Sequence, residues 1–366
     1  MLLWIGILVA VLLATGLGMA YMTAAVGKYS FVIKLAGESR LKKILIPLGI
    51  IILLMIVLSL VFSVANSIVI FLHMMLFFLL YGGIMRIVKA VSGKEFKIFW
   101  QGHLAVLTCI IYMIIAYLIA HHVVKTEYEL TTTKNIEALR IAVFADSHVG
   151  TTFDGEGFAD HMKEIEDQKP DIVLIPGDFV DDSTKKEDMV RACMALGEME
   201  AKYGVWYSFG NHDAGYYNSR DFSRDELIEE LKKNKVHVLE DEVSEIGDLV
   251  IVGRKDSGDK ERAGISKLLA GVDESKYIIV LDHEPNDYDA EGKSAADLVV
   301  SGHTHGGQFF PVTYVGEWIG ANDRTYGHEK RNGTDFIVTS GISCWELPFK
   351  TGTKSEYVII DVKYDK

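Results

Sequence analysis

Residues 140–148 read RIAVFADSH, an apolar β-branched run that stops at Asp146-Ser147-His148. A short run of this kind, closed by turn-forming residues, is typical of a buried strand. If the chain stays extended past the strand, alternate side chains share a face, so Asp146 and His148 would point the same way. The stretch therefore predicts a strand whose carboxyl end presents a carboxylate and an imidazole together.

The same pattern occurs five times in order along the chain. Ordinary strand-end turns also use Gly, Asp, Asn and His. Five apolar strands that end in this way, in order along the chain, nevertheless favour a site, because open α/β sheets build their sites at the carboxyl ends of strands. The four later strands end at Gly177-Asp178, at Gly210-Asn211-His212-Asp213, at His283, and at Gly302-His303-Thr304-His305.

The polar residues after these strands offer carboxylate, imidazole and amide groups and no thiolate. This donor set suits two divalent ions of intermediate hardness (Mn²⁺, Fe²⁺, Zn²⁺ or Ni²⁺), and we expect Mn²⁺ to be favoured. Two such ions about 3.5–4 Å apart can share a hydroxide that attacks a phosphoryl group in line. The donor set therefore predicts metal-dependent phosphoryl chemistry.

Short strands alternate with amphipathic helical stretches after residue 139, which predicts an α/β domain. We expect helices over 160–168 and 221–234. Asp181 and Asp182 are expected to be solvated loop acids, and Trp206 and Trp345 to belong to the aromatic core. The expected strands are 140–145, 172–175, 205–209, 237–239, 249–252, 277–281, 298–300, 336–339 and 357–362.

The chain of 366 residues is 49% hydrophobic and 24% charged, and the two kinds of residue lie in different parts of it. Four apolar stretches each approach the ~20 residues that cross a bilayer as a helix. The sequence therefore predicts a four-span transmembrane region over 1–123, a polar connector over 124–137 and a catalytic domain over 138–364. The expected spans are about 2–22, 44–64, 68–87 and 98–119, with a turn at 65–67 between the second and third.

The charges predict which side of the membrane each part occupies. Residues 1–123 carry nine basic and two acidic residues, and the remainder has a net charge of −20. Because basic loops stay in the cytoplasm, the catalytic domain is expected outside it, in a multi-pass protein of the cell membrane. A cleaved signal peptide fits the first span less well, since no basic region precedes it. The basic residues follow span one (Lys28, Lys34, Arg40, Lys42, Lys43) and span three (Arg86, Lys89, Lys94, Lys97).

Charge and cysteine content exclude other classes of protein. A domain at −20 repels phosphate polymers, so nucleic acid is not an expected partner. Three cysteines are too few for a disulfide scaffold. Transport through the spans is disfavoured because they lack paired charges. The expected partners are the lipid bilayer and a phosphoester or pyrophosphate substrate.

The order DxH…GD…GNHD…H…GHTH resembles that of the calcineurin-like metallophosphoesterases. GHTHGGQ at 302–308 and the later Ser340-Gly341…Leu347-Pro348 are similar to the branch with bacterial membrane-associated phosphodiesterases and lipid-sugar pyrophosphatases. The resemblance implies a four-layer α-β-β-α sandwich, two sheets face to face with helices outside.

The resemblance also implies roles for single residues. Asp178 would bridge two metal ions, and His212 would donate a proton to the leaving group. Relatives often have Pro-x-Arg where this chain has Pro348-Phe349-Lys350, so Lys350 is a candidate substrate contact. The implied ligands are Asp146, His148 and His305 for the first ion, and Asn211, His283 and His303 for the second, with Asp178 shared.

These features predict a phosphoesterase that cleaves phosphodiester or pyrophosphate bonds in lipid or cell-envelope substrates at the extracytoplasmic face. His212, Asp178 and Asn211 are its expected catalytic residues. The alternative is a metal-dependent binding or scaffold module on the same fold without turnover. Such modules usually lose a ligand or the proton donor, whereas every position is filled in this chain.

Overall fold

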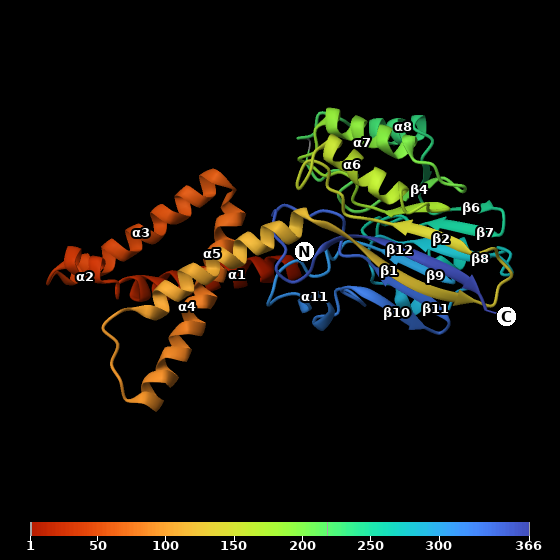
Figure 1. The fold of residues 1–366 in the computed structure, drawn as a ribbon. Helices are drawn as coiled ribbons and strands as arrows, with labels where there is room; N and C mark the ends of the chain where they lie inside the picture. The colour runs from red at the N-terminus through yellow and green to blue at the C-terminus, as the bar shows by residue number, and fades with distance from the viewer. Residues whose placement is uncertain (1, 218, 366) are drawn as a thin grey trace. The chain divides into compact units, whose positions relative to one another are not determined.

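The computed structural model describes residues 2–217 and 219–365, with the side chains of 2–5 and 7 left aside. The chain divides into two compact units, one up to Ile115 and one from Ala116 onward. The first unit is helical and the second contains two β-sheets (Figure 1). The helices of the first unit are α1 (Leu2–Val26), α2 (Ser30–Ala36), α3 (Arg40–Val61), α4 (Val64–Ser92) and α5 (Trp100–His121), the last of which continues into the second unit.

All four expected spans are helices that are long and apolar enough to cross a membrane. The turn between the second and third spans lies at Phe62–Ser63 instead of the expected 65–67. Ser63 caps α4, because its hydroxyl oxygen accepts hydrogen bonds from both the backbone and the side-chain N–H of Asn66. A serine at this position satisfies N–H groups that the first helical turn leaves unpaired, so the helix starts there.

The second unit contains two six-stranded sheets. The first has the order β1-β12-β2-β3-β4-β5, in which only the β12–β2 pair is antiparallel. Its strands are β1 (Val123–Thr132), β2 (Leu139–Val143), β3 (Ile172–Pro176), β4 (Val205–Ser208), β5 (His237–Leu239) and β12 (Ser355–Tyr364).

The second sheet has the order β10-β11-β9-β8-β7-β6, with antiparallel pairs at its two edges. The parallel strands at its centre are β7, β8, β9 and β11. Its strands are β6 (Glu242–Ile246), β7 (Leu249–Gly253), β8 (Tyr277–Leu281), β9 (Leu298–Ser301), β10 (Gly327–Arg331) and β11 (Thr334–Val338).

Alternating side chains of each strand enter different cores. In β2, Ile141 and Val143 pack between the two sheets, whereas Ala142 faces the helices α6 (Gly155–Glu166), α7 (Lys186–Glu198) and α8 (Arg224–Lys233). The outer face of the second sheet packs on the short helices α9 (Ile265–Leu268) and α10 (Tyr288–Glu291). The expected four-layer α-β-β-α arrangement is therefore confirmed, with α6–α8 covering one sheet in Figure 1.

Each of the nine expected strands is present, to within a few residues. The predicted connector over 124–137 is wrong in its first part, because residues 123–132 form β1 and pair in parallel with all of β12. Polar, half-exposed residues do not reveal an edge strand, since only one face of it is buried. Strands β6 and β10 and helix α7 were also not expected.

Candidate metal centre

The seven expected metal ligands all follow strands, and the structure brings them to one place. Parallel strands of the two sheets end at this edge, so loops from both sheets meet there. The first sheet supplies Asp146 and His148 after β2, Asp178 after β3 and Asn211 after β4, and the second supplies His283 after β8 and His303 and His305 after β9.

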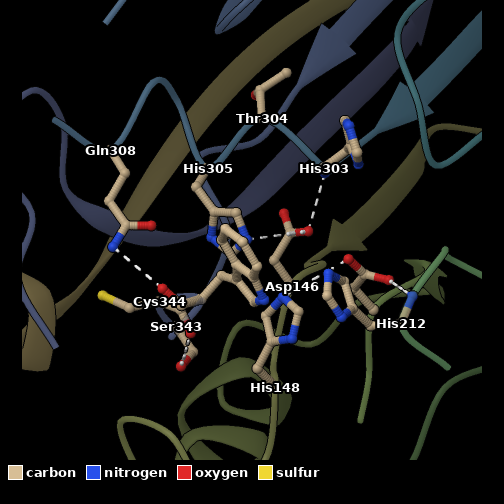
Figure 2. Close-up of polar contacts among 12 residues, drawn as sticks. Asp146, His148, His212, His303, Thr304, His305, Gln308, Ser343 and Cys344 are labelled. Carbon is tan, nitrogen blue, oxygen red and sulfur yellow. Dashed lines mark hydrogen bonds and ion pairs between the residues drawn. The ribbon is translucent and has the colours of Figure 1, made fainter. Parts of the chain in front are cut away.

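Six of these residues form two groups of potential metal ligands. In each group, one ligand atom from every residue lies within 4.8 Å of the other two. Figure 2 shows the side chains of the first group converging beside His303 and His212. The first group is Asp146, His148 and His305, and the second is Asp178, His283 and His303.

The carboxylate of Asp178, a member of the second group, also lies close to the first group. Its Oδ2 is 3.1 Å from Nε2 of His283 and 3.7 Å from Nε2 of His148. Burial by itself would raise the pKa of Asp178, but the neighbouring His283 and His148 hold it well below its ordinary value. A shared, ionised carboxylate is the group that a bridge between two cations requires.

Asn211 joins the second group through His303. Its side-chain oxygen lies 2.9 Å from Nδ1 of His303, and its Nδ2 donates to the Tyr216 hydroxyl at 2.7 Å. Because the amide nitrogen is held by Tyr216, the oxygen faces the metal-binding groups and is available as a ligand.

The backbone at the site is unusual, because five ligands have positive φ angles. L-residues seldom adopt this region, and holding them there costs about 1–3 kcal/mol each unless the surroundings enforce it. The Asp146 and His148 side chains therefore converge through left-handed backbone and not through the extended chain that the sequence suggested. The angles are 54° at Asp146, 36° at His148, 54° at Asp178, 68° at His303 and 48° at His305.

The polar atoms of the first group fit a cation. Oδ2 of Asp146, Nε2 of His148 and Nδ1 of His305 are buried and make no hydrogen bond with the protein. An unpaired buried polar atom costs about 1–3 kcal/mol, so a site with three of them would be stabilised by an ion that they coordinate. The donors are oxygen and nitrogen atoms, which suits the divalent ions expected from the sequence.

Neighbouring groups orient the histidine rings. Nδ1 of His283 lies 2.7 Å from the carbonyl oxygen of Pro176 and donates to it, which leaves Nε2 as the ligand atom. Nδ1 of His148 lies 3.4 Å from Oδ2 of Asp181. Burial lowers the pKa of His303 to about 4, so this ring is neutral at pH 7 and keeps a lone pair for a metal.

His212 lies at the open side of the site. Its backbone N–H donates to Oδ1 of Asp178 at 2.9 Å, and its ring centroid is 5.1 Å from that of His148 and 5.5 Å from that of Trp345. Burial lowers the pKa of His212. The ring is thus adjacent to the ligands and partly exposed, where a substrate would enter.

Asp213 holds two of the ligand loops together. Its buried carboxylate accepts backbone N–H groups from Asp178, Phe179 and Val180 at 2.8–3.1 Å, and from Gly210 at 2.7 Å. Burial raises the pKa of this carboxyl to about 6. Asp213 therefore fixes the loops after β3 and β4 and is a positioning residue.

The expected substrate contact of Lys350 is not supported. Its side chain is fully buried, and Nζ donates to the carbonyl oxygens of Ser340, Gly341 and Lys354 at 2.6–3.2 Å. An ammonium group has three donors, and all three are used. Lys350 thus anchors the loop at 340–341, where a Cβ on Gly341 would meet Asp146 Cβ at 2.8 Å.

Two other residues differ from expectation. Asp181, expected to be solvated, is buried beside His148. Trp345, expected in the core, is 43% exposed and contacts the His212 ring. Asp181 lies three residues after Asp178 on the same loop, and this spacing was the available signal, whereas no local pattern distinguishes Trp345 from the buried Trp206.

Comparisons with known proteins agree with the site. A family model described as calcineurin-like phosphoesterase matches residues 139–307. An uncharacterized metallophosphoesterase of Aquifex aeolicus is 30% identical over 248 residues, which cover 65% of this chain and 90% of that protein. One from Campylobacter jejuni is 29% identical over 235 residues, 62% of this chain and 60% of the relative. A Danio rerio transmembrane protein with a metallophosphoesterase domain is 28% identical over 245 residues, 63% and 54%. The chain thus spans only part of the length of the Campylobacter jejuni and Danio rerio proteins.

Gly210→Ala is expected to abolish metal binding. A Cβ at this position would lie 2.2 Å from Oδ1 of Asp178 and 2.5 Å from its backbone nitrogen, so the carboxylate must move. Because an ion that binds only the folded protein raises its melting temperature, the measurement is the rise in Tm that Mn²⁺ produces. The rise should disappear in the variant.

Gly264→Ala is the matched control, since its Cβ would meet nothing within 4 Å, and it should keep the full rise. A normal rise in Gly210→Ala would contradict the close packing of Gly210 on Asp178.

Asp181→Asn is expected to weaken metal binding about 10–100-fold, the usual effect of losing a partner of a metal-bound histidine. The variant keeps an oxygen for Ser183, which donates its N–H to Asp181 Oδ1 at 2.7 Å, but loses the charge beside His148. Titration of metal-free protein with Mn²⁺, followed by the electron paramagnetic resonance of the free ion, measures the change. Asp160→Asn, on the exposed face of α6, should bind Mn²⁺ like the wild type. Wild-type affinity for Mn²⁺ in Asp181→Asn would refute the role of Asp181 as a partner of His148.

Proposed function

We propose, from the premise that this chain belongs to the calcineurin-like phosphoesterase family, that it is a membrane-held hydrolase of phosphodiester or pyrophosphate bonds that uses two divalent metal ions. The observation that carries the proposal is the position of Asp178, which belongs to the second group of potential ligands and whose Oδ2 lies 3.7 Å from Nε2 of His148 in the first group. The proposed substrates are lipids or other components of the cell envelope, at the extracytoplasmic face.

We assign the residues to two ions from the two groups of potential ligands and from the family resemblance. Asp146, His148 and His305 would hold one, and Asn211, His283 and His303 the other, with Asp178 common to both. When bound, two divalent ions supply an activated water as the nucleophile and positive charge for the phosphoryl oxygens. Mn²⁺ is the proposed metal, since oxygen and imidazole donors without thiolate suit it.

His212 is proposed to protonate the leaving oxygen. Its backbone N–H bonded to Asp178 keeps the ring at a fixed distance from the ligands, and its partial exposure admits the substrate. A proton donor of this kind contributes about 10²–10⁴-fold to a rate. The rings of Trp345 and Tyr216 have centroids 5.5 and 5.0 Å from that of His212, and these contacts would fix the orientation of the His212 ring.

The sidedness rests on the distribution of charge. The nine basic residues of the first unit lie in or directly beside two connections, the one between α1 and α3 and the one between α4 and α5, and the positive-inside rule would place both connections in the cytoplasm. Since the chain crosses once more through α5, the two-sheet unit is then extracytoplasmic.

His212→Ala should impair hydrolysis most for poor leaving groups. With Mn²⁺, its kcat/KM on diphenyl phosphate should fall about 10²–10⁴-fold. The loss on bis-p-nitrophenyl phosphate should be smaller, because p-nitrophenolate leaves readily without a proton. Asp178→Asn should lose activity on both diesters, since it disrupts metal binding.

The matched control is His161→Ala, whose ring interacts with Glu164 on α6, and it should retain wild-type activity. Activity that survives removal of metal by a chelator, or a His212→Ala variant that equals the wild type on diphenyl phosphate, would falsify the proposal. Tight metal binding without turnover on any phosphoester would favour the scaffold module.

Labelling with a membrane-impermeant maleimide should report the sidedness. The three native cysteines are buried, so background labelling should be low. In sealed right-side-out vesicles, Lys233→Cys on α8 should react without permeabilisation, whereas Lys94→Cys between α4 and α5 should react only after it. The reverse pattern would place the two-sheet unit in the cytoplasm.

A further inference from the structure

An aromatic segment at 309–319 follows the last expected metal ligand, and its large apolar side chains face outward. Trp318 is 74% exposed. The segment contains the short helix α11 (Val315–Trp318) and one charged residue, Glu317. Five of its side chains (Phe310, Val312, Tyr314, Trp318 and Ile319) are among the exposed large hydrophobic residues of the two-sheet unit.

The aromatic segment is attached to the loop that carries Trp345. Nε2 of Gln308 donates to the carbonyl oxygens of Leu347 and Phe349 at 3.0 and 3.1 Å. The N–H of Phe310 donates to the Thr351 hydroxyl at 2.9 Å. In Figure 2, Gln308 lies beside His305 and the loop at Ser343 and Cys344. The start of the segment is therefore fixed within the same unit as the metal centre.

The same loop is fixed to the end of a membrane span. The backbone N–H of Lys350 donates to the carbonyl oxygen of Ala116 at 3.2 Å, and the ring of Phe349 packs edge-on against Tyr117, with centroids 6.3 Å apart. Ala116 and Tyr117 belong to the last turns of α5, an apolar helix long enough to cross a bilayer. The end of such a helix lies at the membrane–water interface, so this loop and the attached aromatic segment start at that level.

The composition of the segment suits that level. Tyr and Trp gather where a bilayer meets water, because their rings are apolar with a polar edge. A protein that bound the aromatic segment would have to compete with the lipids that surround α5 near Ala116. The exposed apolar residues of the segment are therefore linked to α5 through the loop at 349–351.

The loop to which the aromatic segment is attached also borders the metal centre. Trp345 is 43% exposed and contacts His212, the proposed proton donor. A phosphoester that approached His212 past Trp345 would pass the loop to which the aromatic segment is attached.

We propose that the aromatic segment 309–319, together with Trp345, inserts into the interfacial layer of the bilayer that α5 spans, and that the metal centre takes the phosphoester group of a lipid in that leaflet. The second statement rests on the proposed function. It commits the substrate to a lipid and not to a soluble ester or a free envelope polymer.

Fluorescence quenching tests the insertion. The full chain is reconstituted in nanodiscs, with an environment-sensitive fluorophore on Trp318→Cys or on Lys233→Cys; the native cysteines are buried. Lipids with a nitroxide near the headgroup end of the acyl chain should quench the label at 318 but not the label at 233. The emission of the label at 318 should also shift to the blue, because the inserted fluorophore leaves water. Equal, weak quenching at both positions would overturn the insertion, whatever the activity.

Activity tests the substrate class. Phe310→Ser and Trp318→Ser should lower kcat/KM for a lipid phosphodiester in the nanodisc about tenfold or more, because the site no longer shares the surface of its substrate. Hydrolysis of soluble bis-p-nitrophenyl phosphate should stay within about twofold. Met194→Ser, at an exposed apolar residue of α7, is the matched control and should change neither rate.

The outcomes separate the two proposals. Equal losses on both substrates would show that the segment only shapes the site, and hydrolysis of an envelope polymer but no lipid would overturn the lipid assignment. If the wild type hydrolyses neither lipid nor soluble diester with any metal, the proposed function fails, while the quenching result still decides the insertion.

Discussion

The structure of the metal centre depends on one buried carboxylate, that of Asp178. It lies within 3.1 Å of His283 and 3.7 Å of His148, residues that come from different sheets. Buried ionised groups are stable only where opposite charge or hydrogen bonds compensate them. Asp178 obtains part of this compensation from the His212 backbone N–H, and divalent cations would provide the rest. The loops of both sheets are thus arranged around a charge that neither sheet could accommodate by itself.

The protein maintains this arrangement against an unfavourable backbone. Five ligands have positive φ angles, and Gly210 packs where a Cβ would collide with Asp178. Asp213 and Lys350 hold the strained loops in place. Asp213 accepts backbone N–H groups from two loops, and Lys350 donates to three carbonyl oxygens. Neither residue reaches the substrate side. Such strain persists at functional sites because the surrounding contacts enforce it, here the rigid packing between two sheets.

The proposed insertion would link the membrane to this chemistry through more than tethering. The loop that carries Trp345 contacts His212 on one side and the last turns of α5 on the other. An attached site meets substrates of the same surface at a high effective concentration. If the aromatic segment also enters the interface, the direction from which a headgroup approaches His212 is set as well. The same few residues would then couple position in the bilayer to access to the metals.

The sequence by itself determined the apolar spans and the nine expected strands, and it singled out the seven candidate ligands, because these depend on local periodicity and on polar residues at strand ends. It could not determine that residues 123–132 form an edge strand, that Asp181 and Lys350 are buried or that Trp345 is exposed. Burial, hydrogen-bond partners and pKa values depend on what distant segments place around a side chain. A charged residue in a loop has the same sequence signature whether it contacts a substrate or stabilises the loop. Lys350 was expected to contact a substrate, and only the tertiary packing shows that it is buried and bonds to the loop's carbonyl oxygens.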